Sequence, residues 1–259
     1  MKSNFDRKKN YRNQQVKQKF PSYAYGSDIT SLSNDVMSNL NTQISELRLR
    51  TSVEEKASQG NYAMAIFLLD ELIAICPDNA ADYNNRGLMY FRNNQIIEAL
   101  CDLSQALQIN PCLDSAYNNR ANCHAAQGDL AEAIADYELA LDINPANLRA
   151  WINQGITFRE LELYDLALEN LDIALIIGDS LEERIYGERG RTHHLRGDWN
   201  CAVGDYYKAL DILATKPSLA RYEQKVTGWL DKLLTPISDR EINLINLLFC
   251  KLREAFWIE

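Results

Sequence analysis

Apolar residues recur at intervals of three and four near both ends of the chain, which is the spacing of one face of an α-helix. The pattern runs through residues 29–49, 218–234 and 238–256. Its apolar positions are Ile29, Leu32, Val36, Leu40, Ile44 and Leu47; Leu219, Tyr222, Val226, Trp229 and Leu233; and Ile242, Ile245, Leu248, Leu252 and Phe256. The sequence therefore predicts a leading helix over residues 27–45 that continues into the next segment, and a pair of capping helices within residues 217–259.

Between these ends, small and bulky residues recur every 34 residues, with one inserted residue before the last copy. Residues 82–87 read DYNNRG, and residues 116–121 read AYNNRA. Two series of small residues keep this register: Gly87, Ala121, Gly155 and Gly190; and Ala99, Ala133, Ala167 and Ala202. Small residues there let two helices approach closely, and bulky residues fill the gaps between units. The predicted copies are 46–79, 80–113, 114–147, 148–181 and 183–216.

This unit resembles the tetratricopeptide repeat (TPR), in which an early aromatic residue, small residues and a closing proline recur at fixed places. Pro111 and Pro145 stand at the closing place, whereas Asp179 and Ala214 replace the proline in the last two copies. The first copy also lacks the early aromatic residue. The resemblance implies an all-α fold, a right-handed α-solenoid of antiparallel helix pairs, because no single unit can bury its apolar face alone.

The composition agrees with a helical protein that carries an uneven charge. The chain has 259 residues with 11 glycines and 6 prolines, which are too few turn formers for a sandwich or barrel of short strands. The net charge is −9, yet residues 1–20 hold seven basic residues and one acidic residue. The sequence predicts a basic, disordered tail over residues 1–26. Because the rest of the chain is acidic, we expect contact with nucleic acid or a membrane only through this tail.

Targeting signals are missing from the sequence. Residues 1–26 contain no apolar segment of a secretory signal, and no run approaches the roughly 18 apolar residues of a membrane span. The six cysteines form no C-x-x-C pair. We therefore expect reduced cysteines and a cytoplasmic location.

Arginine and aspartate are correlated within the copies. Wherever the seventh place is arginine, the residue sixteen positions later is aspartate. The pairs are Arg86 with Asp102, Arg120 with Asp136, and Arg189 with Asp205; the remaining good copy has the neutral residues Gln154 and Asn170 there. We predict a charge-assisted bond between the two helices of a copy, rather than a ligand-binding role for these arginines.

The sixth place carries asparagine in three successive copies, as Asn85, Asn119 and Asn153. The resemblance implies that this place faces the concave groove of a TPR array, where asparagine can bind the main chain of an extended peptide. A carboxamide suits that task because it both donates and accepts hydrogen bonds. The alternative is that these asparagines only cap or solvate helix turns. Three more asparagines stand beside the series: Asn84, Asn118 and Asn122.

The expected groove is cationic. In the four best copies, the first helices hold nine arginines and five acidic residues, whereas the second helices hold thirteen acidic residues and one lysine. Two glutamates of the first helices, Glu160 and Glu188, oppose the arginines. Since arginine binds carboxylates through two parallel bonds, the predicted partner is an extended segment that is acidic or ends in a free carboxylate. The arginines expected in the groove are Arg92, Arg149, Arg159, Arg184 and Arg191.

Catalytic and metal-binding motifs are not found in the sequence. His193 and His194 are adjacent, so on a helix they point about 100° apart and make a poor metal pair. No phosphate-binding loop, nucleophile elbow or H-E-x-x-H motif occurs. We expect no enzyme activity, no cofactor, no metal and no small-molecule substrate.

The sequence favours a non-catalytic scaffold or adaptor that binds an extended peptide or a partner protein in the groove. Arrays with YNNRG segments resemble those of cyanobacterial and plastid assembly factors, which suggests a role in assembling a larger complex. The residues by which some TPR domains hold a chaperone C-terminus are matched only by Asn119 and Arg149. Two alternatives stay open: a structural subunit docked through its terminal helices, and a factor tethered to membrane or nucleic acid by the basic tail.

Overall fold

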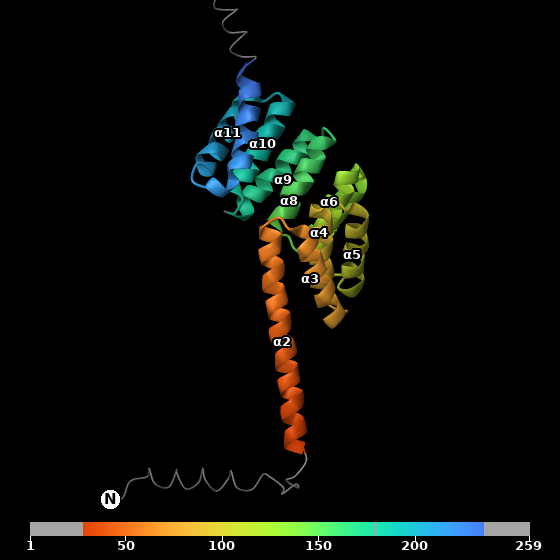
Figure 1. Ribbon diagram of the computed structural model, residues 1–259. Helices are drawn as coiled ribbons and strands as arrows, with labels where there is room; N and C mark the ends of the chain where they lie inside the picture. Colours follow the sequence, from red (N-terminus) through yellow and green to blue (C-terminus); the bar gives the residue numbers. More distant parts are fainter. Residues whose placement is uncertain (1–27, 179, 236–259) are drawn as a thin grey trace, which may run out of the picture. The chain divides into compact units, whose positions relative to one another are not determined.

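The computed structural model describes residues 28–178 and 180–235, and all regular structure in these residues is helical (Figure 1). The helices are α2 (Asp28–Ser58), α3 (Tyr62–Ile75), α4 (Ala80–Arg92), α5 (Ile96–Ile109), α6 (Asp114–Gln127), α7 (Leu130–Ile143), α8 (Leu148–Glu160), α9 (Tyr164–Ile177), α10 (Glu182–Arg196), α11 (Trp199–Leu213) and the short 3₁₀ helix η2 (Pro217–Leu219). Residues 220–235 are also helical. The predicted basic tail and the predicted helix over 238–256 lie outside the described residues.

The chain divides into two units, Met1–Thr51 and Ser52–Glu259. The described part of the first unit belongs to α2, a single helix of 31 residues that covers the predicted leading helix from residue 28 onward. Its apolar side chains are exposed over three turns: Val36, Met37, Leu40, Ile44 and Leu47. No helix among the described residues is long and apolar enough to cross a membrane.

In the second unit, consecutive helices pack as pairs: α4 with α5, α6 with α7, α8 with α9, and α10 with α11. Each second helix also contacts the next first helix, and the first helices contact one another from α4 to α6, α8 and α10 (Figure 1). This arrangement confirms the predicted all-α solenoid of helix pairs. It also gathers the first helices of successive pairs side by side.

Small residues allow the close approach of the two helices in each pair. A Cβ atom added to Gly87 would stand 2.8 Å from the Cγ atom of Leu103, and one added to Gly190 would stand 2.9 Å from the ring of Tyr206. Neither distance is compatible with normal packing. The partner alanines of the second helices, such as Ala99 and Ala202, are fully buried.

The predicted ion pairs are confirmed. Arg86 donates to both carboxylate oxygens of Asp102 at 2.6 and 2.7 Å, and this bond raises the pKa of the guanidinium. The equivalent pairs, Arg120 with Asp136 and Arg189 with Asp205, have distances of 2.7 to 2.8 Å. The neutral copy keeps the same link as a bond of 2.8 Å from Asn170 to Gln154.

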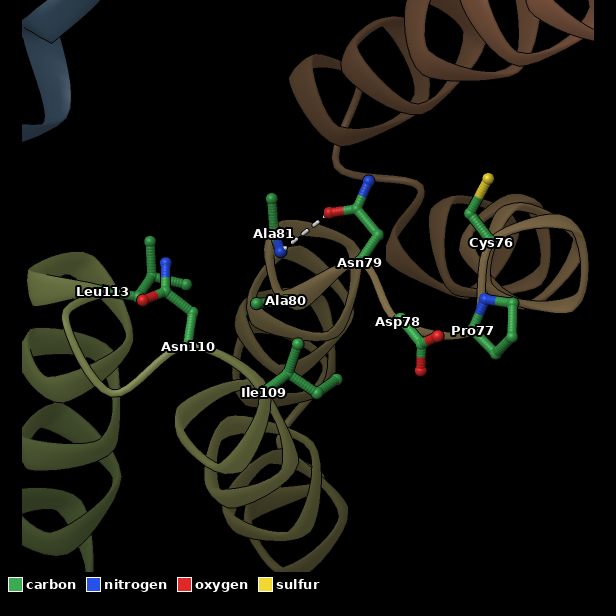
Figure 2. A pocket seen from close by; sticks show the side chains of 9 residues that line it. All are labelled: Cys76, Pro77, Asp78, Asn79, Ala80, Ala81, Ile109, Asn110 and Leu113. Carbon is green, nitrogen blue, oxygen red and sulfur yellow. Dashed lines mark hydrogen bonds between the residues drawn. The ribbon is translucent and has the colours of Figure 1, made fainter.

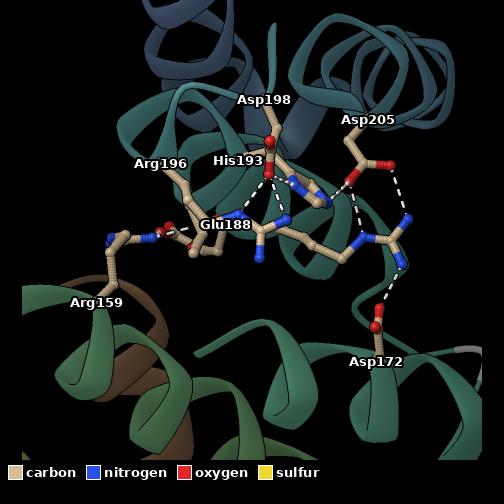
Figure 3. Close-up of polar contacts among 9 residues, drawn as sticks. Arg159, Asp172, Glu188, His193, Arg196, Asp198 and Asp205 are labelled. Atoms are coloured by element: carbon tan, nitrogen blue, oxygen red, sulfur yellow. Dashed lines mark hydrogen bonds and ion pairs between the residues drawn. The ribbon is translucent and has the colours of Figure 1, made fainter. Parts of the chain in front are cut away.

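Two of these arginines also bind the preceding helix pair. Arg86 donates to Asp70 of α3 at 2.7 Å, and Arg189 donates to Asp172 of α9 at 2.6 Å. Figure 3 shows Asp172 and Asp205 on opposite sides of the same guanidinium. The arginine therefore joins neighbouring repeats as well as the two helices of its own repeat.

The helix at residues 220–235 covers the last helix pair. Its buried residues Val226, Leu230 and Leu233 join one apolar cluster with Tyr206 and Leu213 of α11. Gly187 of α10 lets this helix come close, because an added Cβ atom there would stand 2.5 Å from the hydroxyl of Tyr222 and 3.2 Å from Val226. We call this helix, which lies within the region 217–259 where capping helices are predicted, the capping helix.

Two variants compare the stability contributed by the buried and by the exposed ion pair of Arg86. Asp102→Ala should lower the free energy of unfolding by about 2–3 kcal/mol, because it leaves a largely buried guanidinium with one partner. Asp70→Ala removes a half-exposed carboxylate and should change stability by about 1 kcal/mol or less. Urea unfolding of both variants would test this, and equal effects would contradict the assignment.

A second pair of variants tests the close contact of the capping helix. Gly187→Ala should destabilise the protein by about 1–3 kcal/mol through overpacking against Tyr222. Gly204, in α11, has no atom within 4 Å of an added Cβ, so Gly204→Ala should stabilise the helix by about 0.5–1 kcal/mol. Thermal unfolding measures both, and two changes of the same sign would count against the described packing.

Candidate functional site

A row of hydrogen-bonded side chains crosses the first helices of four successive pairs. Asn119 of α6 donates to Asn84 of α4 at 2.9 Å, and Asn153 of α8 donates to Asn118 of α6 at 3.2 Å. Asn118 in turn donates to Asn119 at 3.4 Å. Arg184 of α10 closes the row with a bond of 2.9 Å to Asn153. We call these five residues the amide row.

Two members of the amide row retain hydrogen-bonding capacity at the surface. Asn84 and Asn118 are buried, whereas Asn119 and Asn153 are partly exposed. Among the described residues, Asn119 and Asn153 each use one N–H and accept one bond within the row. A carboxamide has two N–H groups and two acceptor positions. One donor and one acceptor therefore remain on each, which is the complement of a peptide group.

The other predicted residues near the row differ in their surroundings. Asn85 and Arg149 are exposed. Asn122 does not join the row, because its side-chain oxygen accepts a bond of 2.7 Å from the hydroxyl of Tyr137. Burial raises the pKa of Tyr137, so this hydroxyl stays a donor at neutral pH.

Arg159, which the sequence placed in the groove, binds a carboxylate of the protein itself. Its guanidinium donates to Glu188 of α10 at 2.8 Å, and only 12% of the Arg159 side chain and 4% of the Glu188 side chain are exposed (Figure 3). Tyr222 donates to the other oxygen of Glu188 at 3.2 Å, and Lys225 lies 3.7 Å away. The charge of Arg159 is therefore neutralised within the structure.

Tyr222 and Lys225, which come from the capping helix, were not predicted as site residues from the sequence. A signal was present, since Tyr222 stands 34 residues after Glu188 and so occupies the sixth place of one further repeat step. Continuing the register past residue 216 would have found it. The structure thus extends the series of the sixth place from Asn119 and Asn153 to Glu188 and Tyr222.

Arg191 lies at the same end of the face, against an aromatic side chain. Its guanidinium carbon is 5.7 Å from the ring centre of Trp229, and the ammonium of Lys225 is 4.7 Å from that ring. Arg191 also lies 3.5 Å from the Nδ1 atom of His194. Burial, together with Arg191, lowers the pKa of His194 and so favours the neutral imidazole.

An open cleft of about 590 Å³ is lined by none of the amide-row residues (Figure 2). The connections that follow α3 and α5 line it, and its walls include Cys76, Pro77, Ile109 and Leu113. The side-chain oxygen of Asn79 at its edge caps α4 by accepting a bond of 3.0 Å from the backbone of Ala81. Among the described residues, no three His, Cys, Asp or Glu side chains are placed to hold a metal ion.

Stacked helix pairs with polar side chains along the first helices define a helical-repeat protein of the solenoid class. Residues 115–147 match the tetratricopeptide repeat family model. This match shows a tetratricopeptide repeat at residues 115–147, and the stacked helix pairs around it have the same repeat fold. A comparison with curated protein sequences found no match.

Several solved structures share this fold. A thermophilic TPR protein of Thermus thermophilus is 17% identical, with a TM-score of 0.63 over 70% of this chain and 98% of its own. MamA of Desulfovibrio magneticus RS-1 is 15% identical, with a TM-score of 0.55 over 66% and 97% of the two chains. The Cut9–Hcn1 hetero-tetramer of the APC/C contains a chain that is 20% identical, with a TM-score of 0.62 over 75% and 38%.

The contacts of Tyr222 predict a loss of stability at alkaline pH. Burial, reinforced by the charge of Glu188, raises the pKa of Tyr222 in the folded protein, whereas an unfolded tyrosine has a pKa of about 10. Stability is therefore fully present below about pH 10 and falls as the pH rises above it. From about pH 9 to about pH 11, the contribution lost is about 1.4 kcal/mol.

Urea unfolding at both pH values checks this with two variants. Tyr222→Phe should be less stable at neutral pH but should lose about 1.4 kcal/mol less than the wild type on going to the higher pH. Tyr207, which is exposed, is the matched control, and Tyr207→Phe should behave as the wild type. A wild-type pH dependence in Tyr222→Phe would contradict the described environment of Tyr222.

Proposed function

We infer that the TPR fold serves here as a protein–protein interaction scaffold. We propose that this protein is a non-catalytic adaptor that binds an extended segment of a partner protein across α4, α6, α8 and α10. The observation that carries the proposal is the amide row, in which Asn119 and Asn153 each retain one donor and one acceptor.

The spacing of the row supports an extended ligand. Packed helices lie roughly 8–10 Å apart, so Asn119 and Asn153 project from neighbouring helices about that distance apart. An extended chain rises about 3.3 Å per residue, and about three residues would bridge the two asparagines. The bonds within the row hold both carboxamides in place before a ligand arrives, which reduces the entropy lost on binding.

The charges on the first helices favour an acidic partner. The structure pairs Arg86, Arg120, Arg159, Arg189 and Arg196 with carboxylates of the protein. Among the described residues, four arginines of the first helices form no ion pair: Arg92, Arg149, Arg184 and Arg191. We therefore propose a segment that carries acidic side chains or a C-terminal carboxylate. The proposed setting is the assembly of a larger complex in the cytoplasm.

A second candidate function is a structural subunit that docks through its leading helix. The exposed apolar side chains of α2 favour it: Val36, Met37, Leu40, Ile44 and Leu47. Such side chains at helical spacing are typical of a helix that packs against a partner. The basic tail that would tether the protein to membrane or nucleic acid lies outside the described residues.

Affinity capture followed by quantitative mass spectrometry tests the binding face. Replacing Asn85, Asn119 and Asn153 together by alanine should reduce the recovery of groove-bound partners by about tenfold, since each lost hydrogen bond contributes about 0.5–1.5 kcal/mol. The variant must first show cooperative thermal unfolding, because Asn119 and Asn153 also join neighbouring repeats.

Two further variants make the capture experiment specific. Asn93→Ala removes an exposed asparagine of the α4–α5 connection and should leave recovery unchanged. Leu40→Ser combined with Ile44→Ser alters only the exposed face of α2. If the folded triple variant recovers every partner at wild-type levels, the groove proposal fails, and losses confined to the α2 variant would favour the structural subunit.

A further inference from the structure

The capping helix and α10 form a cationic corner at one end of the amide row. We use this name for Arg184, Arg191, Lys225 and Trp229. Arg184 belongs to the row itself, through its bond of 2.9 Å to Asn153. Its backbone oxygen lies 3.3 Å from the hydroxyl of Tyr222, which ties this turn of α10 to the capping helix.

The positive charge of the corner exceeds the negative charge that faces it. Glu188 is the buried carboxylate at this place, and Arg159 neutralises it at 2.8 Å. Lys225 lies 3.7 Å from the other oxygen of Glu188, and its side chain is 54% exposed. Among the described residues, neither Arg184 nor Arg191 has a carboxylate within ion-pair distance. The corner therefore retains two guanidinium groups and an exposed ammonium group.

The packing around the cationic corner restrains these side chains on one face of the protein. Arg184 and Arg191 are seven residues apart, so they lie on the same face of α10 about 10 Å from each other. The ring of Trp229 lies 5.7 Å from the guanidinium of Arg191 and 4.7 Å from the ammonium of Lys225. Contact with an aromatic face restrains a long cationic side chain without neutralising its charge.

We propose that the cationic corner is a carboxylate subsite at the α10 end of the groove. This inference rests on the proposed function and deepens it by giving the bound segment a polarity. The part of the segment over α4 and α6 meets the carboxamides of the amide row, whereas the part over α10 meets Arg184 and Arg191, which form no ion pair among the described residues. The ligand class is therefore an extended segment that is neutral at one end and bears carboxylates at the other.

Fluorescence anisotropy with defined peptides tests the subsite in the full-length protein at low salt. The probe is a labelled octapeptide of alternating glutamate and alanine with blocked ends, and its counterpart carries glutamine in place of glutamate. The glutamate peptide should bind at least about tenfold more tightly, and the difference should shrink as salt screens the charges. A third peptide with a free C-terminus distinguishes a terminal carboxylate from side-chain carboxylates as the preferred source.

Three variants locate the binding, each of which removes one positive charge. Arg191→Gln and Lys225→Gln should each weaken binding of the glutamate peptide by about fivefold or more. Lys208→Gln removes an exposed lysine of the second helix α11 and should change it by less than about twofold. Because Arg191 is partly buried whereas the Lys225 side chain is exposed, Lys225→Gln keeps the test valid if Arg191→Gln proves unstable.

The outcomes separate this inference from the proposed function. Equal binding of the glutamate and glutamine peptides, equal effects of all three variants, or no binding of any peptide would overturn the subsite. In that case, partner capture that still depends on Asn119 and Asn153 would leave the groove proposal standing. The reverse pattern, with selective peptide binding at the corner and unchanged capture by the asparagine variant, would remove the groove proposal and keep the subsite.

Discussion

The close approach of the two helices within each repeat is the constraint on which the rest of the structure depends. An added Cβ atom would clash at Gly87 and Gly190 and would be tightly packed at Gly155, and the second helices carry buried alanines in the same register. At this short distance, an arginine of the first helix can reach an aspartate of the second helix with two bonds. The same distance recurs in each repeat, so equivalent side chains of successive first helices come into line.

The amide row follows from that alignment, and it has two consequences. Its bonds join α4, α6, α8 and α10 directly, in addition to the apolar contacts between the repeats. They also orient the carboxamides of Asn119 and Asn153, whose remaining donor and acceptor positions stay accessible. Stability and proposed recognition thus use different atoms of the same side chains. A substitution at these positions therefore affects both, which is why a folding control must accompany any binding measurement.

Repeats allow much of the fold to be predicted from one sequence, because each copy serves as a control for the others. The correlation of Arg86 with Asp102 and of Gln154 with Asn170 is sufficient to predict a bond between the two helices of a repeat. The bonds of the amide row were not predicted, because they join the fifth place of one copy to the sixth place of the next. That offset is 35 residues rather than 34, and only the arrangement of neighbouring helices shows that it brings the side chains together.

The repeat spacing does not predict the polar contacts near the capping helix. Arg159 and Glu188 lie in neighbouring repeats and are 29 residues apart. This separation differs from the repeat length of 34 residues, so the repeat spacing does not predict their ion pair. Tyr222, Lys225 and Trp229 come from a helix whose apolar spacing was recognised but whose polar residues had no equivalent for comparison. The charge balance of the first helices follows from the structure alone, which assigns Arg159 to an internal ion pair and leaves Arg184 and Arg191 without one among the described residues.

The side-chain amide resonances of Asn119 and Asn153 provide the most direct test of binding at the amide row. Their NH₂ signals in a ¹⁵N-labelled protein can be followed while the shortest binding segment of a captured partner is added. We expect these signals to shift with saturation at the measured affinity, while those of Gln154 and Asn170, which bond to each other inside the repeat, stay in place. Saturable binding that leaves the Asn119 and Asn153 signals unmoved would show that the partner binds elsewhere.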